Sequence, residues 1–216
     1  HDLALAYKPN LAFYEVFGAK GWDALAETLS YIPKSCITIA DAKRGDIGNT
    51  AALYAKTFFE TYQFDTLTVN PYMGYDSIAP YLNYLDKGVI VLGLTSNSGA
   101  NDFEKLEIEN LTLAEIVAQK VSLWNVNENC LLVVGATNGS DILRIRKQAK
   151  EMYFLVPGIG AQGGSLADVI HFGGKNVIIN ASRSIIFADD SMQFAQTARQ
   201  EALKLKLEIE MLIKKI

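Results

Sequence analysis

Four charged side chains stand within six residues of one another, at Asp41, Lys43, Arg44 and Asp46. They follow a β-branched run at residues 36–40, which is typical of a parallel strand covered on both faces. The strand is expected to end near Asp41. Because side chains on a strand alternate between its faces, Asp41 and Lys43 point to the same side, about 7 Å apart along the backbone. The spacing therefore predicts an ion pair at the end of a buried strand.

The residues after this pair predict a turn into a helix. Gly45 breaks the extended conformation, so Asp46 is carried away from the ion pair. Asn49 or Thr50 is then expected to cap a helix that begins at Ala51. Charge and spacing alone leave a second interpretation open, in which the cluster is a solvated strand end. Its ion pair would then contribute about 0–1 kcal/mol, and Asp46 would only face a helix dipole.

Length and charge restrict the class of protein. A chain of 216 residues is long enough for one large domain with a substantial core. The formal net charge of −4 provides no basic surface of the kind that binds nucleic acid or an anionic membrane. No apolar run reaches the roughly 20 residues of a membrane span, and the first residues lack the basic region of a signal peptide. A cytoplasmic protein with neither nucleic-acid nor membrane partners is expected.

Cysteine and histidine are too few for the chemistry that usually needs them. Cys36 and Cys130 each stand at the start of an expected strand, with no close spacing to a histidine or another cysteine. Metal binding or a structural disulfide is therefore not expected, and both residues are interpreted as buried free thiols. The two histidines, His1 and His171, make a catalytic triad improbable.

Strands and helices are expected to alternate about every 25 residues, which favours a parallel sheet with helical crossovers. Polar residues and glycine follow most of the strands, as in a (β/α)8 TIM barrel, whose functional groups lie at the strands' carboxyl ends. We therefore expect a single TIM-barrel domain over residues 1–216, lacking its first β/α unit because the chain opens on a strand. The expected strands are residues 3–7, 36–40, 66–69, 88–94, 131–134, 154–156 and 176–179.

Two late segments indicate a phosphate site. A glycine-rich loop at residues 157–164 follows the penultimate strand, and Arg183 follows the last one. Glycine lets backbone N–H groups approach an anion, and the guanidinium group of arginine supplies a planar pair of donors. The loop alone is a weak signal, because such loops also serve as turns. Its pairing with Arg183 makes the signal more specific.

Residues 41–50 resemble the Asp-x-Lys-x-x-Asp-Ile-x-x-Thr signature of the orotidine 5'-phosphate decarboxylases. The resemblance implies that Asp41 and Lys43 are catalytic and that Lys43 is the proton donor. It also implies that Asp46, Ile47 and Thr50 cross a dimer interface into the neighbouring subunit's site. That role agrees with the expectation that Asp46 points away from Asp41.

Two further segments match the same family. Lys8-Pro-Asn resembles the segment after the family's second strand, which implies a catalytic Lys8 and places Asn10 near the ligand. The alternative for Lys8 is a strand-end lysine that reaches solvent. Thr95 and Ser96 resemble the loop that contacts the pyrimidine, although a hydroxyl-rich turn is an alternative. Ser98 stands where the family often has proline, so the stiffness of this loop differs.

The phosphate-binding segments complete the resemblance, which covers essentially the whole chain. Pro157, Gln162 and Gly163 match the loop in which the glutamine bridges pyrimidine and phosphate. Ser182 and Arg183 match the phosphate-binding end of the last strand. The family's first-strand aspartate, which holds the ribose, has no counterpart in this sequence.

The resemblance implies a homodimer that converts orotidine 5'-monophosphate to uridine 5'-monophosphate in pyrimidine biosynthesis, with neither cofactor nor metal. Two alternatives stay open. A related sugar-phosphate decarboxylase or synthase barrel carries Asp-x-Lys-x-x-Asp but uses a divalent metal. A non-catalytic barrel would bind the phosphate ligand without consuming it, since fold alone never settles function. Whether the chain is part of a bifunctional protein is also left open.

Overall fold

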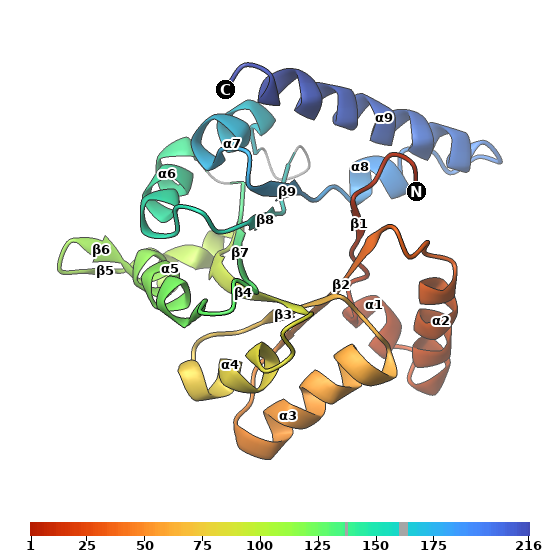
Figure 1. The fold of residues 1–216 in the computed structure, drawn as a ribbon. Helices are drawn as coiled ribbons and strands as arrows, with labels where there is room; N and C mark the ends of the chain where they lie inside the picture. Colours follow the sequence, from red (N-terminus) through yellow and green to blue (C-terminus); the bar gives the residue numbers. More distant parts are fainter. Residues whose placement is uncertain (137, 160–163) are drawn as a thin grey trace. The chain divides into compact units, whose positions relative to one another are not determined.

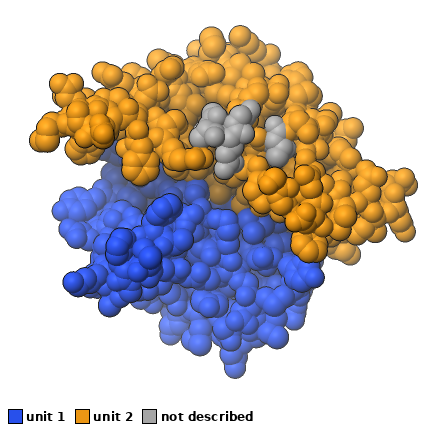
Figure 2. Space-filling view, turned by 180° about the vertical axis from the view of Figure 1, so that it is seen from behind, with its two compact units in different colours: residues 1–92, 124–130 blue, residues 93–123, 131–216 orange. Residues whose placement is uncertain are grey.

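The computed structural model describes residues 1–136, 138–159 and 164–216. The chain divides into two compact units, which Figure 2 draws in blue and orange. Unit 1 comprises residues 1–92 and 124–130, and unit 2 comprises residues 93–123 and 131–216. In each unit, parallel strands alternate with helices along the chain (Figure 1). The expectation of one domain over residues 1–216 stays a prediction.

Unit 1 is built on parallel strands that pair in chain order, β1 with β2, β2 with β3 and β3 with β4. Helix α1 packs against α2, and α3 packs against α4. The strands are β1 (Ala6–Tyr7), β2 (Ile37–Arg44), β3 (Thr66–Val69) and the first five residues of β4 (Gly88–Leu94), whose last two residues belong to unit 2. The helices are α1 (Ala12–Glu15), α2 (Ala19–Ser30), α3 (Gly48–Lys56), the π-helical turn η1 (Thr57–Thr61) and α4 (Tyr75–Leu82).

The core of unit 1 forms where the apolar helix faces meet the sheet. Leu25 is the apolar residue that α2 buries. The helix ends at Ser30, shortly before Pro33, which cannot continue a helix. Aromatic side chains fill much of the remaining interior, because each removes a large apolar area from water. The fully buried large side chains of this unit include Phe58, Phe64, Leu67 and Tyr81.

Unit 2 repeats the arrangement with β7 paired to β8 and β8 paired to β9, all parallel. Helix α7 packs against α6 and α9, and α8 packs against α9. The strands are β7 (Cys130–Val134), β8 (Phe154–Val156), β9 (Val177–Ile179) and the short antiparallel pair β5 (Glu107–Ile108) and β6 (Leu111–Thr112). The helices are η2 (Ser98–Asp102), α5 (Leu113–Trp124), α6 (Gly139–Gln148), α7 (Leu166–Gly173), α8 (Arg183–Ile186) and α9 (Phe194–Ile213).

The predicted strands at residues 66–69, 88–94 and 154–156 match the structure to the residue. The first strand of the chain is shorter than predicted, because only Ala6–Tyr7 of residues 3–7 form a strand. The predicted end of β2 is wrong, because this strand continues beyond Asp41 to Arg44. The polar character of residues 101–110 also predicts a loop there, and this prediction is wrong in part. The segment contains the end of the η2 turn and strand β5, which pairs with β6 in a hairpin.

Two predicted helix caps are wrong. Helix α3 begins at Gly48 with Ile47 at its N-cap and no side-chain hydrogen bond, so neither Asn49 nor Thr50 caps it. For helix α6 the sequence predicts Ser140 or Asp141 as the N-cap, but the cap is Asn138, whose side-chain oxygen accepts the N–H of Asp141. In both cases the helix begins earlier than the sequence predicts.

Both cysteines are buried free thiols, as expected. Burial raises the pKa of Cys130 to about 12, so this side chain stays an uncharged thiol at neutral pH. No helix in the described part of the chain is both long and apolar enough to cross a membrane.

Candidate active site

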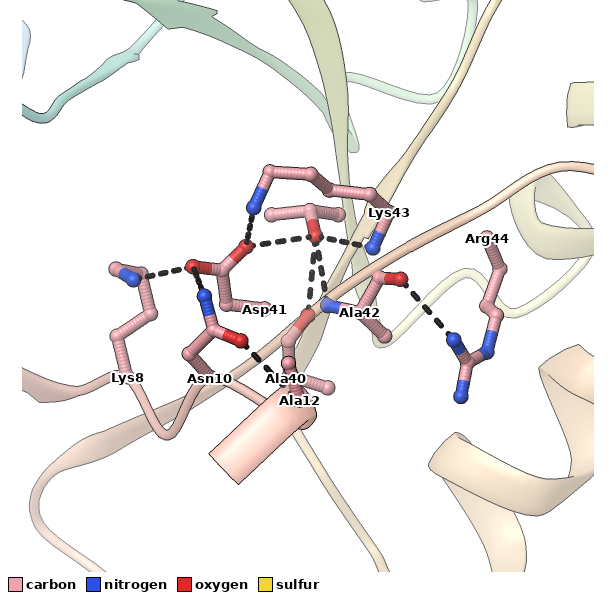
Figure 3. Close-up of polar contacts among 9 residues, drawn as sticks. Lys8, Asn10, Ala12, Ala40, Asp41, Ala42, Lys43 and Arg44 are labelled. Carbon is pink, nitrogen blue, oxygen red and sulfur yellow. Dashed lines mark hydrogen bonds and ion pairs between the residues drawn. The ribbon is translucent and has the colours of Figure 1, made fainter. Parts of the chain in front are cut away.

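A buried carboxylate between two ammonium groups forms the centre of the candidate site. Asp41 is 8% exposed, and its two oxygens contact different lysines. The Nζ atom of Lys8 lies 2.5 Å from Oδ2, and that of Lys43 lies 2.5 Å from Oδ1. Figure 3 shows each lysine reaching a different oxygen of the carboxylate. The predicted pair of Asp41 with Lys43 is confirmed, and Lys8 joins it.

Parallel pairing of β1 with β2 brings Lys8 to Asp41 across 33 residues of chain. The segment after β1 continues along β2, with the N–H of Asp41 donating to the carbonyl of Pro9 (3.1 Å) and that of Leu11 to the carbonyl of Asp41 (3.2 Å). Asn10 adds a side-chain bond from Nδ2 to Oδ2 of Asp41 (3.3 Å). The strand ends therefore place the charges, as expected for parallel strands whose carboxyl ends meet.

The electrostatics keep Asp41 ionised. Burial by itself raises the pKa of this carboxyl group, but the positive charges of Lys8 and Lys43 and their hydrogen bonds outweigh burial. The pKa of Asp41 is therefore lowered from its ordinary value. The two lysines differ in exposure, since the Lys8 side chain is 12% exposed and that of Lys43 is 47% exposed. Of the two lysine side chains, that of Lys43 is the more accessible to a reactant.

Backbone geometry at Lys43 is unusual. Its φ of 49° lies in the left-handed region, which costs a residue with a side chain about 1 kcal/mol or more. The register of β2 against β3 shifts at this point, between Ala40 and Arg44. The side chain of Arg44, the last residue of β2, is held by an ion pair with Glu15 and by a hydrogen bond from Nη1 to the carbonyl of Ala42 (3.2 Å). The strand therefore carries a fixed irregularity under its charged residues.

The Thr95 loop of unit 2 is held by Glu104, which the sequence analysis missed. The backbone N–H of Thr95 donates to Oε2 of Glu104 (2.6 Å), and its hydroxyl lies 2.8 Å from Oε1. Gly135 lies against the next residue of the same loop. A Cβ atom at Gly135 would lie 2.7 Å from the backbone nitrogen of Ser96, so only glycine fits there. No sequence signal identified either residue. Glu104 lies nine positions after Thr95 in a polar stretch, and Gly135 is distant from the loop in the chain.

The predicted phosphate residues are described only in part. Pro157 follows β8, and its carbonyl accepts the N–H of Ala136 (2.9 Å). Ser182 precedes α8 and Arg183 begins it, and both are exposed. Gln162 and Gly163 lie outside the described residues. The role of these side chains in binding phosphate stays a prediction.

The predicted dimer residues lie at the start of α3. The carboxylate of Asp46 accepts the N–H of Ile47 at 2.8 Å. Ile47 is 53% exposed, and Thr50 is exposed as well. Gly45 lies against the loop after β3, where a Cβ atom would be 3.6 Å from Cε of Met73. The role of this segment in a partner subunit stays a prediction.

Comparison with known proteins identifies the family. The model of the orotidine 5'-phosphate decarboxylase / HUMPS family matches residues 1–198. The chain belongs to this family. A curated orotidine 5'-phosphate decarboxylase of Flavobacterium johnsoniae is 47% identical over 99% of this chain and 80% of its own length. That of Phocaeicola vulgatus is 51% identical over 95% of this chain and 78% of its own length. Members under this name are carboxy-lyases, and the chain is an enzyme of this group.

Solved structures of the family confirm the fold. The structure of Leishmania donovani OMP decarboxylase has a TM-score of 0.90 and 42% identity, covering 99% of this chain and 83% of its own. The structure of Leishmania donovani UMP synthase has a TM-score of 0.92 and 43% identity over 99% of this chain, which spans 47% of that longer protein. The predicted (β/α)8 barrel class is therefore confirmed for this member of the decarboxylase family.

Acid unfolding should reveal the lowered pKa of Asp41 in this family member. The pKa of Asp41 is lower in the folded state than its ordinary value of 3.8. The ionised side chain therefore makes its full contribution to stability at pH values above 3.8. That contribution is lost as the pH falls through the folded-state pKa. The wild type's advantage in free energy of unfolding over Asp41→Asn should therefore be constant near neutral pH and shrink below about pH 4. Urea titrations at several pH values would measure it, and parallel curves down to about pH 3 would contradict the assignment.

Proposed function

We propose that this chain decarboxylates orotidine 5'-monophosphate to uridine 5'-monophosphate, as a step of pyrimidine biosynthesis in the cytoplasm. The observation that carries the proposal is the Lys8–Asp41–Lys43 array in a member of this family. Asp41 is buried and ionised between two ammonium groups, while the Lys43 side chain is about half exposed. This arrangement offers a fixed negative charge and a proton within one small cluster.

In the proposed reaction the bond between C6 of the pyrimidine and its carboxylate carbon breaks, and CO2 leaves. The electron pair of that bond stays on C6, which the ring cannot delocalise well. The ammonium group of Lys43 stabilises this developing charge and then transfers a proton from Nζ to C6. Asp41 faces the departing carboxylate, whose charge is lost in the transition state. Lys8 holds Asp41 ionised throughout. The reaction proposed here uses no cofactor and no metal.

We further propose a homodimer in which Asp46, Ile47 and Thr50 enter the partner's site. The exposed apolar surface beside Ile47 supports this proposal. The adjoining loop after β3 carries Tyr72, 84% exposed, and Met73, 45% exposed. Large apolar side chains grouped at the surface often mark a protein interface.

The remaining predicted residues are assigned to binding. Thr95 and Ser96 contact the pyrimidine, and Asn10 lies near the ligand. Contacts at the phosphate, far from C6, provide binding energy that can be used at the reacting carbon. The residues proposed for the phosphate end are Pro157, Gln162, Gly163, Ser182 and Arg183.

Arg183→Ala should raise KM for orotidine 5'-monophosphate by about 10²-fold, because a charge-assisted bond to phosphate contributes about 1.5–3 kcal/mol. Steady-state kinetics would measure the change. Lys175→Ala is the matched control, since it removes an exposed cation at the opposite end of β9 and should leave KM unchanged. Equal KM values for the Arg183→Ala variant and wild type would contradict the phosphate assignment.

The activity itself is tested by following the loss of orotate absorbance when the protein is mixed with orotidine 5'-monophosphate, with and without a chelator. Loss that the chelator does not change is the expected result. Loss that requires a divalent metal would contradict the metal-free reaction. Binding of uridine 5'-monophosphate without any consumption of orotidine 5'-monophosphate would indicate a non-catalytic binding protein and contradict the proposed activity.

A further inference from the structure

The irregularity in β2 lies opposite a single residue of β3. Ala40 pairs with Leu67 and Arg44 pairs with Val69, so residues 41–43 together face only Thr68. Such a bulge removes ladder partners from the backbone groups of the extra residues. Buried N–H groups without partners cost about 1–3 kcal/mol each, so the bulge needs other acceptors.

The hydroxyl oxygen of Thr68 is the acceptor for two of these N–H groups. It is buried, with Thr68 only 1% exposed, and it accepts the N–H groups of Ala42 (3.0 Å) and Lys43 (2.9 Å). A hydroxyl has two lone pairs and one hydrogen, so both lone pairs are used. The hydroxyl can donate its hydrogen to the carbonyl of Ala40 (3.3 Å) or to Oδ1 of Asp41 (3.4 Å). All of the hydroxyl's bonding capacity is therefore spent on residues 40–43.

We propose that Thr68 is a positioning residue, whose hydroxyl holds Lys43 in its left-handed conformation and so directs the Lys43 amine at Asp41. The inference rests on the proposed function, since it assigns a role within the same array. Thr68 acts through the backbone and through Oδ1, the oxygen that Lys43 contacts. Without the hydroxyl, the left-handed conformation of Lys43, with its φ of 49°, is no longer stabilised by this hydrogen bond. The Lys43 amine then loses its fixed direction.

The test compares Thr68→Val, which removes the hydroxyl at nearly constant size, with Thr68→Ser, which keeps it. Thr68→Val should lower kcat by about 10²-fold while KM changes less than about threefold, because misplacement of a reacting group affects the chemical step. Thr68→Ser should restore kcat to within about threefold of wild type. Thr66→Val is the matched control, because its hydroxyl reaches the carbonyl of Thr38 at the other end of β3.

Several outcomes would overturn the inference. A kcat for Thr68→Val within about threefold of wild type would do so, as would equal losses for the valine and serine variants. If Thr68→Val does not fold, hydrogen exchange of the wild type provides a second test. The amides of Ala42 and Lys43 should exchange as slowly as those of the core strands. Rapid exchange would contradict the proposed hydrogen bonds to the Thr68 hydroxyl.

Lys43→Ala, measured in parallel, separates this inference from the proposed function. An inactive Lys43→Ala variant beside a fully active Thr68→Val variant would keep the array and discard the role of Thr68. A folded wild type that does not consume orotidine 5'-monophosphate would discard the reaction. The exchange rates of the two amides would then still decide whether Thr68 holds the bulge.

Discussion

Lys43→Ala should lower kcat for orotidine 5'-monophosphate by at least about 10³-fold, because the change removes both the proton donor and the positive charge beside C6. The fold should survive, since the Lys43 side chain is about half exposed and its loss leaves no large cavity. Single-turnover kinetics under saturating substrate would measure the chemical step. Circular dichroism and thermal unfolding would establish that the variant is folded.

Lys87→Ala is the matched control for this experiment. Lys87 lies beside an aspartate as well, with Nζ 3.9 Å from Oδ2 of Asp86, but it precedes β4 at the amino end of the strand. Removing its charge should leave kcat unchanged. Near-normal turnover by Lys43→Ala would eliminate Lys43 as the proton donor, whatever the control does.

Mixing inactive Asp41→Ala and Asp46→Ala subunits should restore activity. Each site is proposed to take Asp41 from one subunit and Asp46 from its partner, so a mixed dimer has one site with both lesions and one with neither. At equal mixing half of the dimers are mixed, and the restored activity should approach about a quarter of the wild-type value. The decarboxylation rate after subunit exchange is the measurement, with exchange verified by mass spectrometry of differently tagged subunits.

Each variant carried alone through the same exchange procedure is the control and should stay inactive. Verified mixed dimers without activity would show that the two aspartates belong to the same subunit's site. Substantial activity of Asp46→Ala alone would instead remove Asp46 from the array.

The sequence was sufficient for the strand positions and for part of the site. The strands of both units are short β-branched runs bounded by glycine, proline or polar residues, so local pattern locates them. Alternation along β2 predicted that Asp41 and Lys43 would meet, and the pair is confirmed. The prediction assumed a regular strand, whereas the contact forms across a bulge with Lys43 in the left-handed region.

The rest depends on contacts between distant residues. Thr68 lies 25 positions from Lys43, and nothing in its own neighbourhood marks it as a bulge partner. Glu104 holds Thr95 through a backbone N–H, a group that every residue except proline possesses. Ile47 is the N-cap of α3 and makes no side-chain capping bond, although Asn49 and Thr50 stand nearby. Local propensity failed at these positions because tertiary contacts outweigh it.

The bulge at residues 41–43 has a consequence for protein engineering. Grafting Asp-x-Lys onto a regular strand of another barrel would leave the two side chains roughly 7 Å apart along the backbone, with the amine free to choose among many rotamers. A transplant that preserves the geometry must include the extra residues of β2 and a hydroxyl at the facing position of the neighbouring strand. The transferable module is therefore a two-strand backbone motif that includes the supporting side chain as well as the charged pair.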